Sequence, residues 1–311
     1  MKPSTLEVAM HAWTRLAART FGGAFGRVPA VPEPERGRTD AGGGIELSWL
    51  RWPGPAGARP LVLLHGLNNN AWAWARVATL MRAERTVVAV SLRGHGRSTV
   101  PDGGWDLASM AGDVLGLLDA IAPGPVDLGG HSMGGKVAPR VAAEAPGRVA
   151  SLSLADPVPP SGFNPLLRAF PALVDAALRP ERGPFPDRDA LLAAMAVPVY
   201  LRCGDATDLR VWEESFVREP DGSYRHTLPE PAPRALARRA LNEDITPMLA
   251  AVACPVLLLR PSLSVAFLPW ETAAMRRAIR GLAVRTVPGD HTFIHTNPFD
   301  TAAAMRPVLE Q

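Results

Sequence analysis

The sequence is poor in cysteine and in lysine. Its two cysteines, Cys203 and Cys254, match neither a metal-binding spacing nor a disulfide framework. Lysine occurs only at Lys2 and Lys136, so the net charge of +3 rests on scattered arginines, without a basic helix. There is no glycine-rich phosphate loop. We therefore expect no cofactor, no metal and no nucleic-acid partner.

The sequence also lacks a long apolar run. Residues 1–28 carry arginines among their apolar residues, which argues against both a secretory signal and a membrane-spanning helix. This stretch predicts a short amphipathic helix that packs on its own domain, so membrane contact is not expected. Residues 29–44 are rich in proline, glycine and charge, which predicts a linker. We expect a cytoplasmic protein in which residues 1–44 form an N-terminal helix and linker.

From residue 45 onward, apolar strands alternate with amphipathic helices. Helical spacing of apolar residues is present at 71–82 and 106–121. Around these helices, short apolar runs predict strands at 45–52 (an edge strand), 61–64, 86–92, 125–128 and 149–155. Such alternation predicts an α/β fold with a mostly parallel sheet flanked by helices.

The rhythm of strands stops in residues 158–250, which are rich in proline, and it resumes at 255–260 and 282–287. In open parallel sheets the ligand lies outside the carboxyl ends of the strands, so an insertion there would roof the site. We therefore expect a core α/β domain in two parts, 45–157 and 251–311, with a helical cap or lid at 158–250. The helical pieces predicted within it are 166–178, 190–195 and 233–241.

One stretch, 126–140, contains the pattern Gly-x-Ser-x-Gly as Gly130-His131-Ser132-Met133-Gly134. It lies between a predicted buried strand and a predicted helix at 136–145. On such a sharp turn the serine backbone is strained, and side chains at the glycines would clash with the crossing backbone. The turn exposes the hydroxyl beside the positive end of a helix. The pattern predicts Ser132 as a nucleophile.

A serine hydroxyl is a weak nucleophile, so it needs a base within hydrogen-bond distance and an acid that orients this base. Among the seven histidines, His291 lies just past the last predicted strand, on a glycine-containing loop at the same edge of the sheet as Ser132. We predict His291 as the base. The competing histidines are His65, His95, His131 and His295.

Several motifs, in the same order along the chain, resemble those of the α/β-hydrolase family over residues 45–311. His65-Gly66 resembles the start of the family's oxyanion loop, and residues 93–98 resemble its Arg-Gly-His-Gly-x-Ser turn. The resemblance implies an esterase- or lipase-like serine hydrolase. It also implies an oxyanion hole formed by the backbone N–H groups of Met133 and Leu67, which would stabilise a tetrahedral intermediate.

The acid departs from the commonest family pattern, in which an aspartate follows the strand after the lid. Here that position holds Ser264. We expect the acid to be Asp156, at the carboxyl end of the strand before the lid, a place that some family members use. The competing interpretation is that Asp156 only braces the Asp156-Pro157 turn. Replacing Ser264 with alanine is expected to matter little. A dyad without an acid also stays open, as does an acid from the lid, where the candidates are Asp205, Asp208 and Glu213.

Further side chains near these motifs are candidates for the substrate pocket. Trp72, near the oxyanion loop, and Trp212, in the lid, could wall an apolar acyl pocket, and His65 and His131 could line it. Lys136, one turn into the elbow helix, is expected to be solvated. Residues 68–70, three asparagines, either hold the oxyanion loop by local hydrogen bonds or touch substrate.

These features predict a cofactor-free serine hydrolase that cleaves a small-molecule carboxylic ester, thioester or lactone through an acyl-enzyme. The serine disfavours the epoxide hydrolases and haloalkane dehalogenases of the family, which use a carboxylate nucleophile. Carbon–carbon bond hydrolases and cofactor-free perhydrolases share the triad and stay open, as does a non-catalytic binding protein of this fold. No pattern indicates an oligomeric state.

Overall fold

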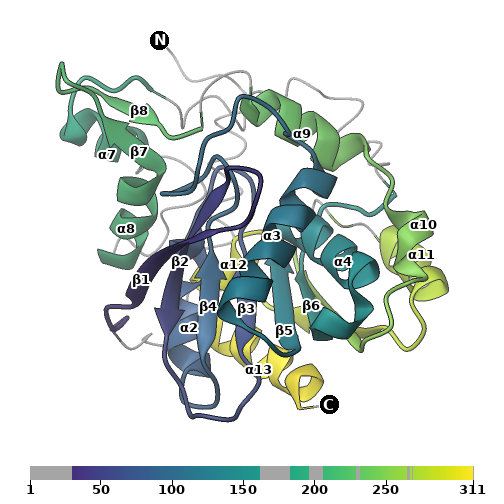
Figure 1. The fold of residues 1–311 in the computed structure, drawn as a ribbon. Helices are drawn as coiled ribbons and strands as arrows, with labels where there is room; N and C mark the ends of the chain where they lie inside the picture. Colours follow the sequence, from purple (N-terminus) through teal and green to yellow (C-terminus); the bar gives the residue numbers. More distant parts are fainter. Residues whose placement is uncertain are drawn as a thin grey trace.

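A computed structural model of the chain describes residues 30–161, 183–195, 206–228, 232–264, 267 and 269–310. The main strands are β1 (Glu35–Asp40), β2 (Glu46–Trp52), β3 (Leu61–Leu64), β4 (Val87–Val90), β5 (Val126–His131), β6 (Val149–Ala155), β9 (Val256–Pro261) and β10 (Ala283–Val287). They form one eight-stranded sheet in the order β1-β2-β4-β3-β5-β6-β9-β10. β2 pairs antiparallel with β1 and β4, and every other pairing is parallel. The predicted mostly parallel sheet is confirmed (Figure 1).

The apolar runs become strands because they are buried on both faces of the sheet. In β3, Leu61 and Leu63 belong to the hydrophobic cluster on one face, whereas Val62 and Leu64 belong to the cluster on the other. All four side chains are fully buried. Side chains alternate along a strand, so only a continuous apolar run suits a strand covered on both sides.

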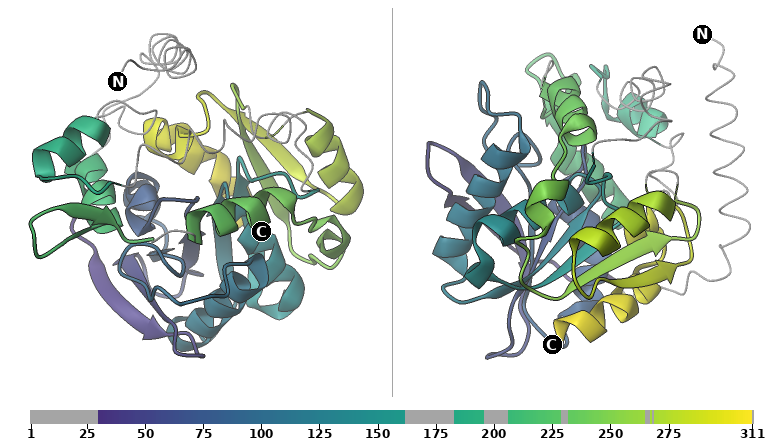
Figure 2. Two further views of the ribbon diagram at one scale, coloured as in Figure 1. Left: turned by 90° about the horizontal axis from the view of Figure 1, so that it is seen from above. Right: turned by 90° about the vertical axis from the view of Figure 1, so that its right-hand side faces the viewer.

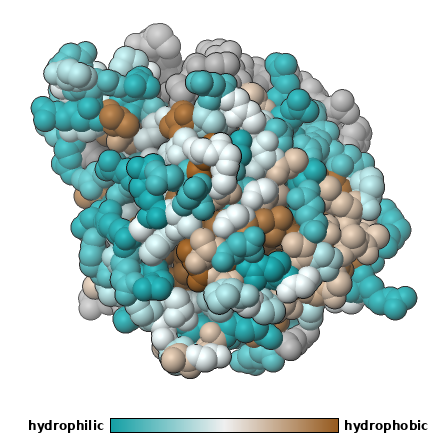
Figure 3. All heavy atoms as spheres, viewed as in Figure 1, coloured by the Kyte–Doolittle hydropathy of each residue, from teal (hydrophilic) through white to brown (hydrophobic). Residues whose placement is uncertain are grey.

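Helices cover both faces of the sheet and complete three layers (Figures 1 and 2). α3 (Leu107–Ile121) and α4 (Gly134–Glu144) pack together on one face. α2 (Ala75–Met81), which follows the short helix η1 (Ala71–Trp74), packs with α13 (Pro298–Leu309) on the other. α11 (Pro269–Ala278) and α12 (Phe293–Thr296) complete the second part of the core. On the face seen in Figure 3, hydrophilic side chains predominate and apolar ones form small separate patches.

The sheet begins earlier in the chain than the sequence predicts. Residues 29–44 were expected to be a linker, but they contain β1, which is the edge strand. Residues 45–52, expected at the edge, contribute the second strand instead. β1 reads Glu-Arg-Gly-Arg-Thr-Asp, so it has no apolar alternation and is held by backbone pairing with β2. The helix predicted at 1–28 lies outside the described residues.

A long insertion separates β6 from β9, which are neighbours in the sheet. Its described elements are α7 (Arg188–Met195), α8 (Ala206–Ser215), β7 (Phe216–Arg218), β8 (Tyr224–His226), α9 (Ala232–Asn242) and α10 (Thr246–Leu249). α7 and α9 agree with the predicted helical pieces, the β7–β8 hairpin was not predicted, and 166–178 lies outside the described residues. α9 and the hairpin lie above the sheet in Figure 1 and stay above it in the right-hand view of Figure 2.

Within the described part of the chain, no helix combines the length and the apolar character that crossing a bilayer requires.

Candidate active site

The turn between β5 and α4 has the strained geometry that its sequence requires. Ser132 has a φ of 53°. This is a left-handed backbone conformation, which residues other than glycine seldom adopt. A Cβ on Gly130 would lie 2.2 Å from the carbonyl oxygen of Gly134, and one on Gly134 would lie 2.5 Å from that of Leu64. Both glycines are therefore sterically necessary. Ser132 is anchored by its N–H, which donates to the carbonyl of Ala155 on β6 at 3.1 Å.

Three side chains from distant parts of the chain meet at this turn. The hydroxyl of Ser132 lies 3.0 Å from Nε2 of His291, and Nδ1–H of His291 donates to Oδ2 of Asp156 at 2.6 Å. Asp156 follows β6 and is fully buried, whereas 27% of the His291 side chain is exposed on the loop after β10. With the proton on Nδ1, the Nε2 lone pair of a neutral ring is directed at the Ser132 hydroxyl.

Backbone strain is concentrated at the same place. Within the described residues, the non-glycine residues with positive φ are Asn68 at 58°, Ser132 at 53° and Asp156 at 40°. They belong to the loop after β3, the turn after β5 and the end of β6. Each such conformation costs about 1–3 kcal/mol and persists only where the surroundings enforce it. Strain of this kind clusters at functional sites, and here two of the three residues, Ser132 and Asp156, are ones predicted for catalysis.

The environment of His291 favours its protonated form. Burial by itself would lower the pKa of this imidazole. The hydrogen bond and the charge of Asp156, together with the charge of Asp290, outweigh burial and raise the pKa above its ordinary value. A raised pKa makes His291 a stronger base toward the Ser132 hydroxyl.

The loop after β3 lies against the turn that carries Ser132. A Cβ on Gly66 would lie 3.0 Å from Cβ of Ser132 and 3.5 Å from its Oγ, so the loop after β3 closes directly against the nucleophile. Within the described part of the chain, the N–H groups of Leu67 and Met133 have no hydrogen-bond partner. Buried N–H groups are seldom unpaired, so these two donors are available for a ligand oxygen.

The sequence suggests that His65 could line the substrate pocket. In the structure both of its ring nitrogens bond to backbone groups instead, and they hold this loop in place. Its Nδ1–H donates to the Gly66 carbonyl at 2.6 Å, and its Nε2 accepts the N–H of Leu92 at 2.9 Å. The ring is fully buried, and burial, followed by the nearby His95, lowers the pKa of His65 well below its ordinary value. His65 is therefore a neutral structural histidine.

His131, also predicted in the pocket, supports the backbone of the His291 loop. Its Nε2–H donates to the carbonyl of His291 at 2.8 Å, and the two ring centroids are 4.7 Å apart. Burial, followed by the neighbouring histidines, lowers the pKa of His131 well below the ordinary value, so the ring stays neutral. Adjacent side chains diverge on a tight turn, which lets His131 and Ser132 contact different atoms of one histidine.

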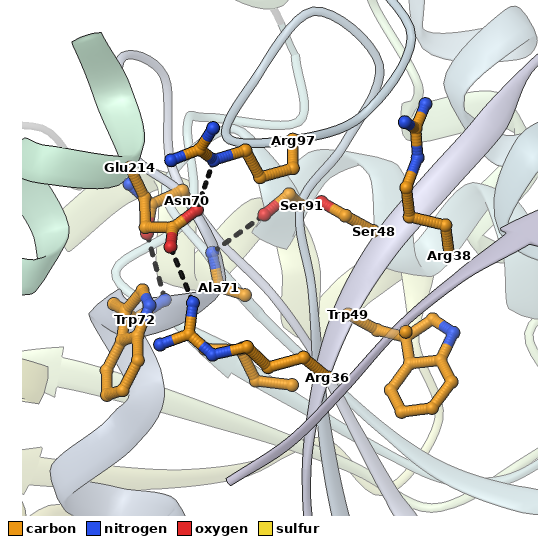
Figure 4. A pocket seen from close by; sticks show the side chains of 12 residues that line it. Arg36, Arg38, Ser48, Trp49, Asn70, Ala71, Trp72, Ser91, Arg97 and Glu214 are labelled. Atoms are coloured by element: carbon orange, nitrogen blue, oxygen red, sulfur yellow. Dashed lines mark hydrogen bonds and ion pairs between the residues drawn. The ribbon is translucent and has the colours of Figure 1, made fainter. Parts of the chain in front are cut away.

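Trp72 lies at another cavity. It lines a cavity of about 410 Å³ between β2, η1 and α8, whose lining includes neither Ser132 nor His291 (Figure 4). At this cavity Glu214 of α8 accepts from Arg36 at 2.7 Å and from Arg97 at 3.0 Å. The lining of this cavity does not test the expectation that Trp72 walls a pocket around Ser132, which stays a prediction.

Trp212 packs inside the insertion. It is buried against Leu191 and Phe216, with Phe185 and Tyr224 at the edge of the same small cluster. An indole in such a cluster stabilises the insertion itself. This packing does not test the expectation that Trp212 walls an acyl pocket, which stays a prediction.

The asparagines after the oxyanion loop hold local structure. Oδ1 of Asn70 accepts the N–H of Trp72 at 3.0 Å and caps η1, while its Nδ2 donates to Val211 O at 2.7 Å and Ser215 Oγ at 2.8 Å on α8. Asn70 thereby links the loop to the insertion. Of the two interpretations left open by the sequence, the contacts of Asn70 agree with the first.

Lys136 is buried, contrary to the expectation of a solvated side chain. It lies on α4, which the insertion covers through α10. Burial lowers the pKa of Lys136 to about 8, although the carboxylates of Glu243, Asp244 and Glu271 act in the opposite direction. In the sequence this position is simply one turn past the elbow. The burial of the side chain goes with the packing of the insertion on α4, which the sequence pattern does not show.

Ser264 contacts the proposed acid, although the sequence assigned it no role. Its hydroxyl donates to Oδ1 of Asp156 at 2.6 Å. Ser264 lies three residues after β9, the strand that pairs with β6, so the two strand ends are adjacent at the same edge of the sheet. The signal that could have identified it was the place itself, where the family resemblance puts an aspartate.

The remaining candidate groups do not form a second reactive site in the part of the chain that is described. No group of three or more His, Cys, Asp or Glu side chains there is placed to hold a metal ion. Burial raises the pKa of the Cys254 thiol to about 11, which leaves it unreactive. Glu213 is paired with Arg188 at 3.0 Å, whereas Cys203 and Asp205 lie outside the described residues.

Known proteins resemble the chain over most of its length. A model for the Alpha/beta hydrolase family matches residues 61–304. The 2-(acetamidomethylene)succinate hydrolase of Mesorhizobium japonicum is 31% identical over 80% of this chain and 87% of that protein. A solved structure of E-2-(acetamidomethylene)succinate hydrolase matches with a TM-score of 0.75 and 26% identity, covering 90% of this chain and 100% of that chain.

Another match has higher identity but aligns with a smaller part of both chains. It is 42% identical over 40% of this chain and spans only 32% of the dihydrolipoyllysine-residue acetyltransferase component of the acetoin cleaving system of Pseudomonas putida. The family match, by contrast, runs from β3 into α13 and includes Ser132, Asp156 and His291. The chain therefore belongs to the alpha/beta hydrolase family and is an enzyme with hydrolase activity.

Proposed function

We propose that the protein is a serine hydrolase that cleaves a carboxylic ester, thioester or lactone through an acyl-enzyme. The observation that supports this most is the continuous path of two hydrogen bonds, 3.0 Å from the Ser132 hydroxyl to His291 and 2.6 Å from His291 to Asp156. A serine, an imidazole and a carboxylate in this order can carry out acyl transfer without a cofactor.

In the first half of the reaction, Oγ of Ser132 attacks the carbonyl carbon of the substrate while Nε2 of His291 takes the hydroxyl proton. Asp156 keeps the proton of the ring on Nδ1 and stabilises the imidazolium that forms. The N–H groups of Leu67 and Met133 donate to the oxygen as it gains charge. Loss of one such donor typically costs about 3 kcal/mol of transition-state stabilisation.

His291 then returns its proton to the leaving group as the first tetrahedral intermediate collapses to the acyl-enzyme, and this step ends the first half. In the second half, water enters. His291 then removes a proton from this water, which attacks the acyl carbon. The tetrahedral intermediate collapses to the acid product and free Ser132, and the proton on His291 returns to the serine oxygen. The same groups therefore serve both halves, and His291 alternates between base and acid.

Residues 158–250 act in this proposal as a lid that selects a small-molecule substrate. The insertion leaves after β6, which ends beside Asp156, and Asn70 connects the oxyanion loop to α8. A relative of similar length is named for the hydrolysis of 2-(acetamidomethylene)succinate, which supports a small substrate. Only the hydrolysis of a small molecule, and not the identity of that compound or of its bond, is carried over from that relative to the proposal.

A fluorophosphonate probe tests the nucleophile, because it labels an activated serine covalently. We expect the wild-type protein to be labelled on the peptide that contains Ser132, and Ser132→Ala to remain unlabelled. Ser153→Ala is the matched control, since Ser153 is a buried serine of β6 whose hydroxyl has no partner among the described residues. Labelling that persists in Ser132→Ala would contradict the proposal.

An ester library graded by acyl length would then define the substrate. Carbon–carbon bond hydrolases and cofactor-free perhydrolases share the triad, so product analysis has to accompany the rates. Release of an acid and an alcohol, thiol or hydroxy acid supports the proposed reaction. Turnover of carbon–carbon substrates alone, or peroxyacid formation in preference to hydrolysis, would contradict it.

A further inference from the structure

The carboxylate of Asp156 has a separate partner on each oxygen. Oδ2 accepts from Nδ1–H of His291, and Oδ1 accepts from the hydroxyl of Ser264, both at 2.6 Å. Asp156 is fully buried, so water does not solvate this group freely. An ionised carboxylate accepts several hydrogen bonds, and a short O–H···O⁻ bond of this length is charge-assisted and strong.

The direction of the Ser264 proton is set by a third group. The N–H of Phe267 donates to Oγ of Ser264 at 2.9 Å. A backbone N–H can only donate, so the Ser264 oxygen accepts there and its own proton is left for Asp156. Phe267 is fully buried, which holds this donor in place. The hydroxyl therefore has one orientation that satisfies every partner.

We propose that Ser264 is a positioning residue for the hydrolase proposed above, because its hydroxyl fixes the plane of the Asp156 carboxylate so that Oδ2 faces His291. A carboxylate held only by His291 could rotate about its own side-chain bonds. A second bond to the other oxygen removes this rotation. Ser264 thus supplies a donor to the acid from the neighbouring strand end.

The contact is specific to Ser264 within its loop. Ser262, two residues earlier, accepts the N–H of Gly289 at 3.2 Å and so joins the loop after β9 to the loop after β10. The hydroxyl of Ser262 contacts backbone atoms of Gly289, whereas the hydroxyl of Ser264 contacts a charged side chain. Removal of the Ser264 hydroxyl is therefore expected to act on the charge and orientation of Asp156.

The first test compares purified full-length wild type, Ser264→Ala, Ser264→Thr and Ser153→Ala over the pH profile of p-nitrophenyl acetate hydrolysis. We expect Ser264→Ala to lower the plateau kcat about tenfold with KM nearly unchanged. The acid limb of kcat/KM should move to higher pH, because one fewer donor shares the negative charge that stabilises the imidazolium. Ser264→Thr retains a hydroxyl and should restore both, and Ser153→Ala should change neither.

The second measurement does not depend on turnover. The proton between His291 and Asp156 gives a downfield proton NMR signal, which His291→Gln would remove and so assign. We expect Ser264→Ala to shift this signal and Ser264→Thr to restore it. If fluorophosphonate fails to label Ser132 while the signal shifts, the proposed function fails and the positioning role stands.

The positioning role is overturned if Ser132 is labelled but Ser264→Ala leaves both the acid limb and the NMR signal unchanged. It is also overturned if Ser264→Ala lowers kcat only in proportion to a fall in the unfolding midpoint, because that pattern describes a structural serine. A Ser264→Thr protein that folds normally and yet matches Ser264→Ala contradicts the role of the hydroxyl.

Discussion

Two pairs of neighbouring histidines lie near the nucleophile, and they differ in whether one member contacts a carboxylate. The ring centroids of His131 and His291 are 4.7 Å apart, and those of His65 and His95 are 4.9 Å apart. Only the first pair contacts a carboxylate, through the bond from His291 to Asp156. Accordingly the pKa of His291 is raised, whereas burial lowers the pKa of His95 to about 4.

The comparison teaches that a buried imidazole becomes a base only where a charge offsets burial. Without one, burial keeps the ring neutral, and its nitrogens serve to hold backbone. His65 joins the oxyanion loop to Leu92, and His95 donates from Nδ1 to the carbonyl of Arg93 at 2.9 Å. His291 therefore acts as a base, whereas His131, in the same pair, holds backbone as both members of the other pair do.

The sharpest way to break the comparison is to replace one histidine from each pair. His291→Gln should lower kcat for a p-nitrophenyl ester by about 10⁵-fold, since no base remains beside Ser132. His65→Gln should lower it by less than about tenfold, because the glutamine amide can still donate to Gly66 and accept from Leu92. The measurement is steady-state turnover, with the unfolding midpoint as a check on folding. Equal losses in the two variants would contradict the assignment.

A smaller effect is expected from Asp156→Asn. Turnover should fall about 10⁴-fold, because the ring loses both its orienting partner and its stabilising charge. The acid limb of kcat/KM, which reports the raised pKa of His291, should move to lower pH.

Asp290→Asn is the matched control for this change. The charge of Asp290 also raises the pKa of His291, but the bond from His291 Nδ1 goes to Asp156. We expect a smaller shift of the limb in the same direction and most of the turnover retained. Near-normal turnover in Asp156→Asn would place the acid elsewhere.

The smallest effect is on stability, and its sign differs between His95 and His291. The pKa of His95 is about 4 in the folded protein, below its ordinary value of about 6.5. As pH falls from 6.5 toward 4, the unfolded chain binds a proton that the folded protein does not, so stability falls by about 1.4 kcal/mol per pH unit. His291, with a raised pKa, contributes stability at low pH that is lost as pH rises through that value.

Urea unfolding near pH 7 and near pH 5 measures this difference. Wild type should lose about 2 kcal/mol of unfolding free energy from His95 over that interval, and His95→Gln should lose correspondingly less. An identical pH dependence in both proteins would show that His95 is not held neutral by the fold.

Local patterns in the sequence are sufficient for the elbow and for the buried strands of the sheet. The glycines around Ser132 are required by contacts within a few residues of the turn and with the adjacent β3, and the apolar runs identify buried strands directly. β1 was missed because its polar residues carry no such signal and its stability comes from pairing with β2. Lys136 was misjudged because its helix α4 packs against α10, which lies more than 100 residues away in the chain.

The sequence by itself determined the fold family, the strained serine turn and the candidate base, because each is written in short runs whose spacing reflects steric or hydrophobic constraints. Only the tertiary structure decided which side chains face each other at the carboxyl edge of the sheet. In it, Asp156 accepts a hydrogen bond from His291 and another from Ser264, whereas His65 and His131 bond to backbone groups. Such contacts join loops that are distant in the chain, and a hydrogen bond depends on distances that no linear pattern records.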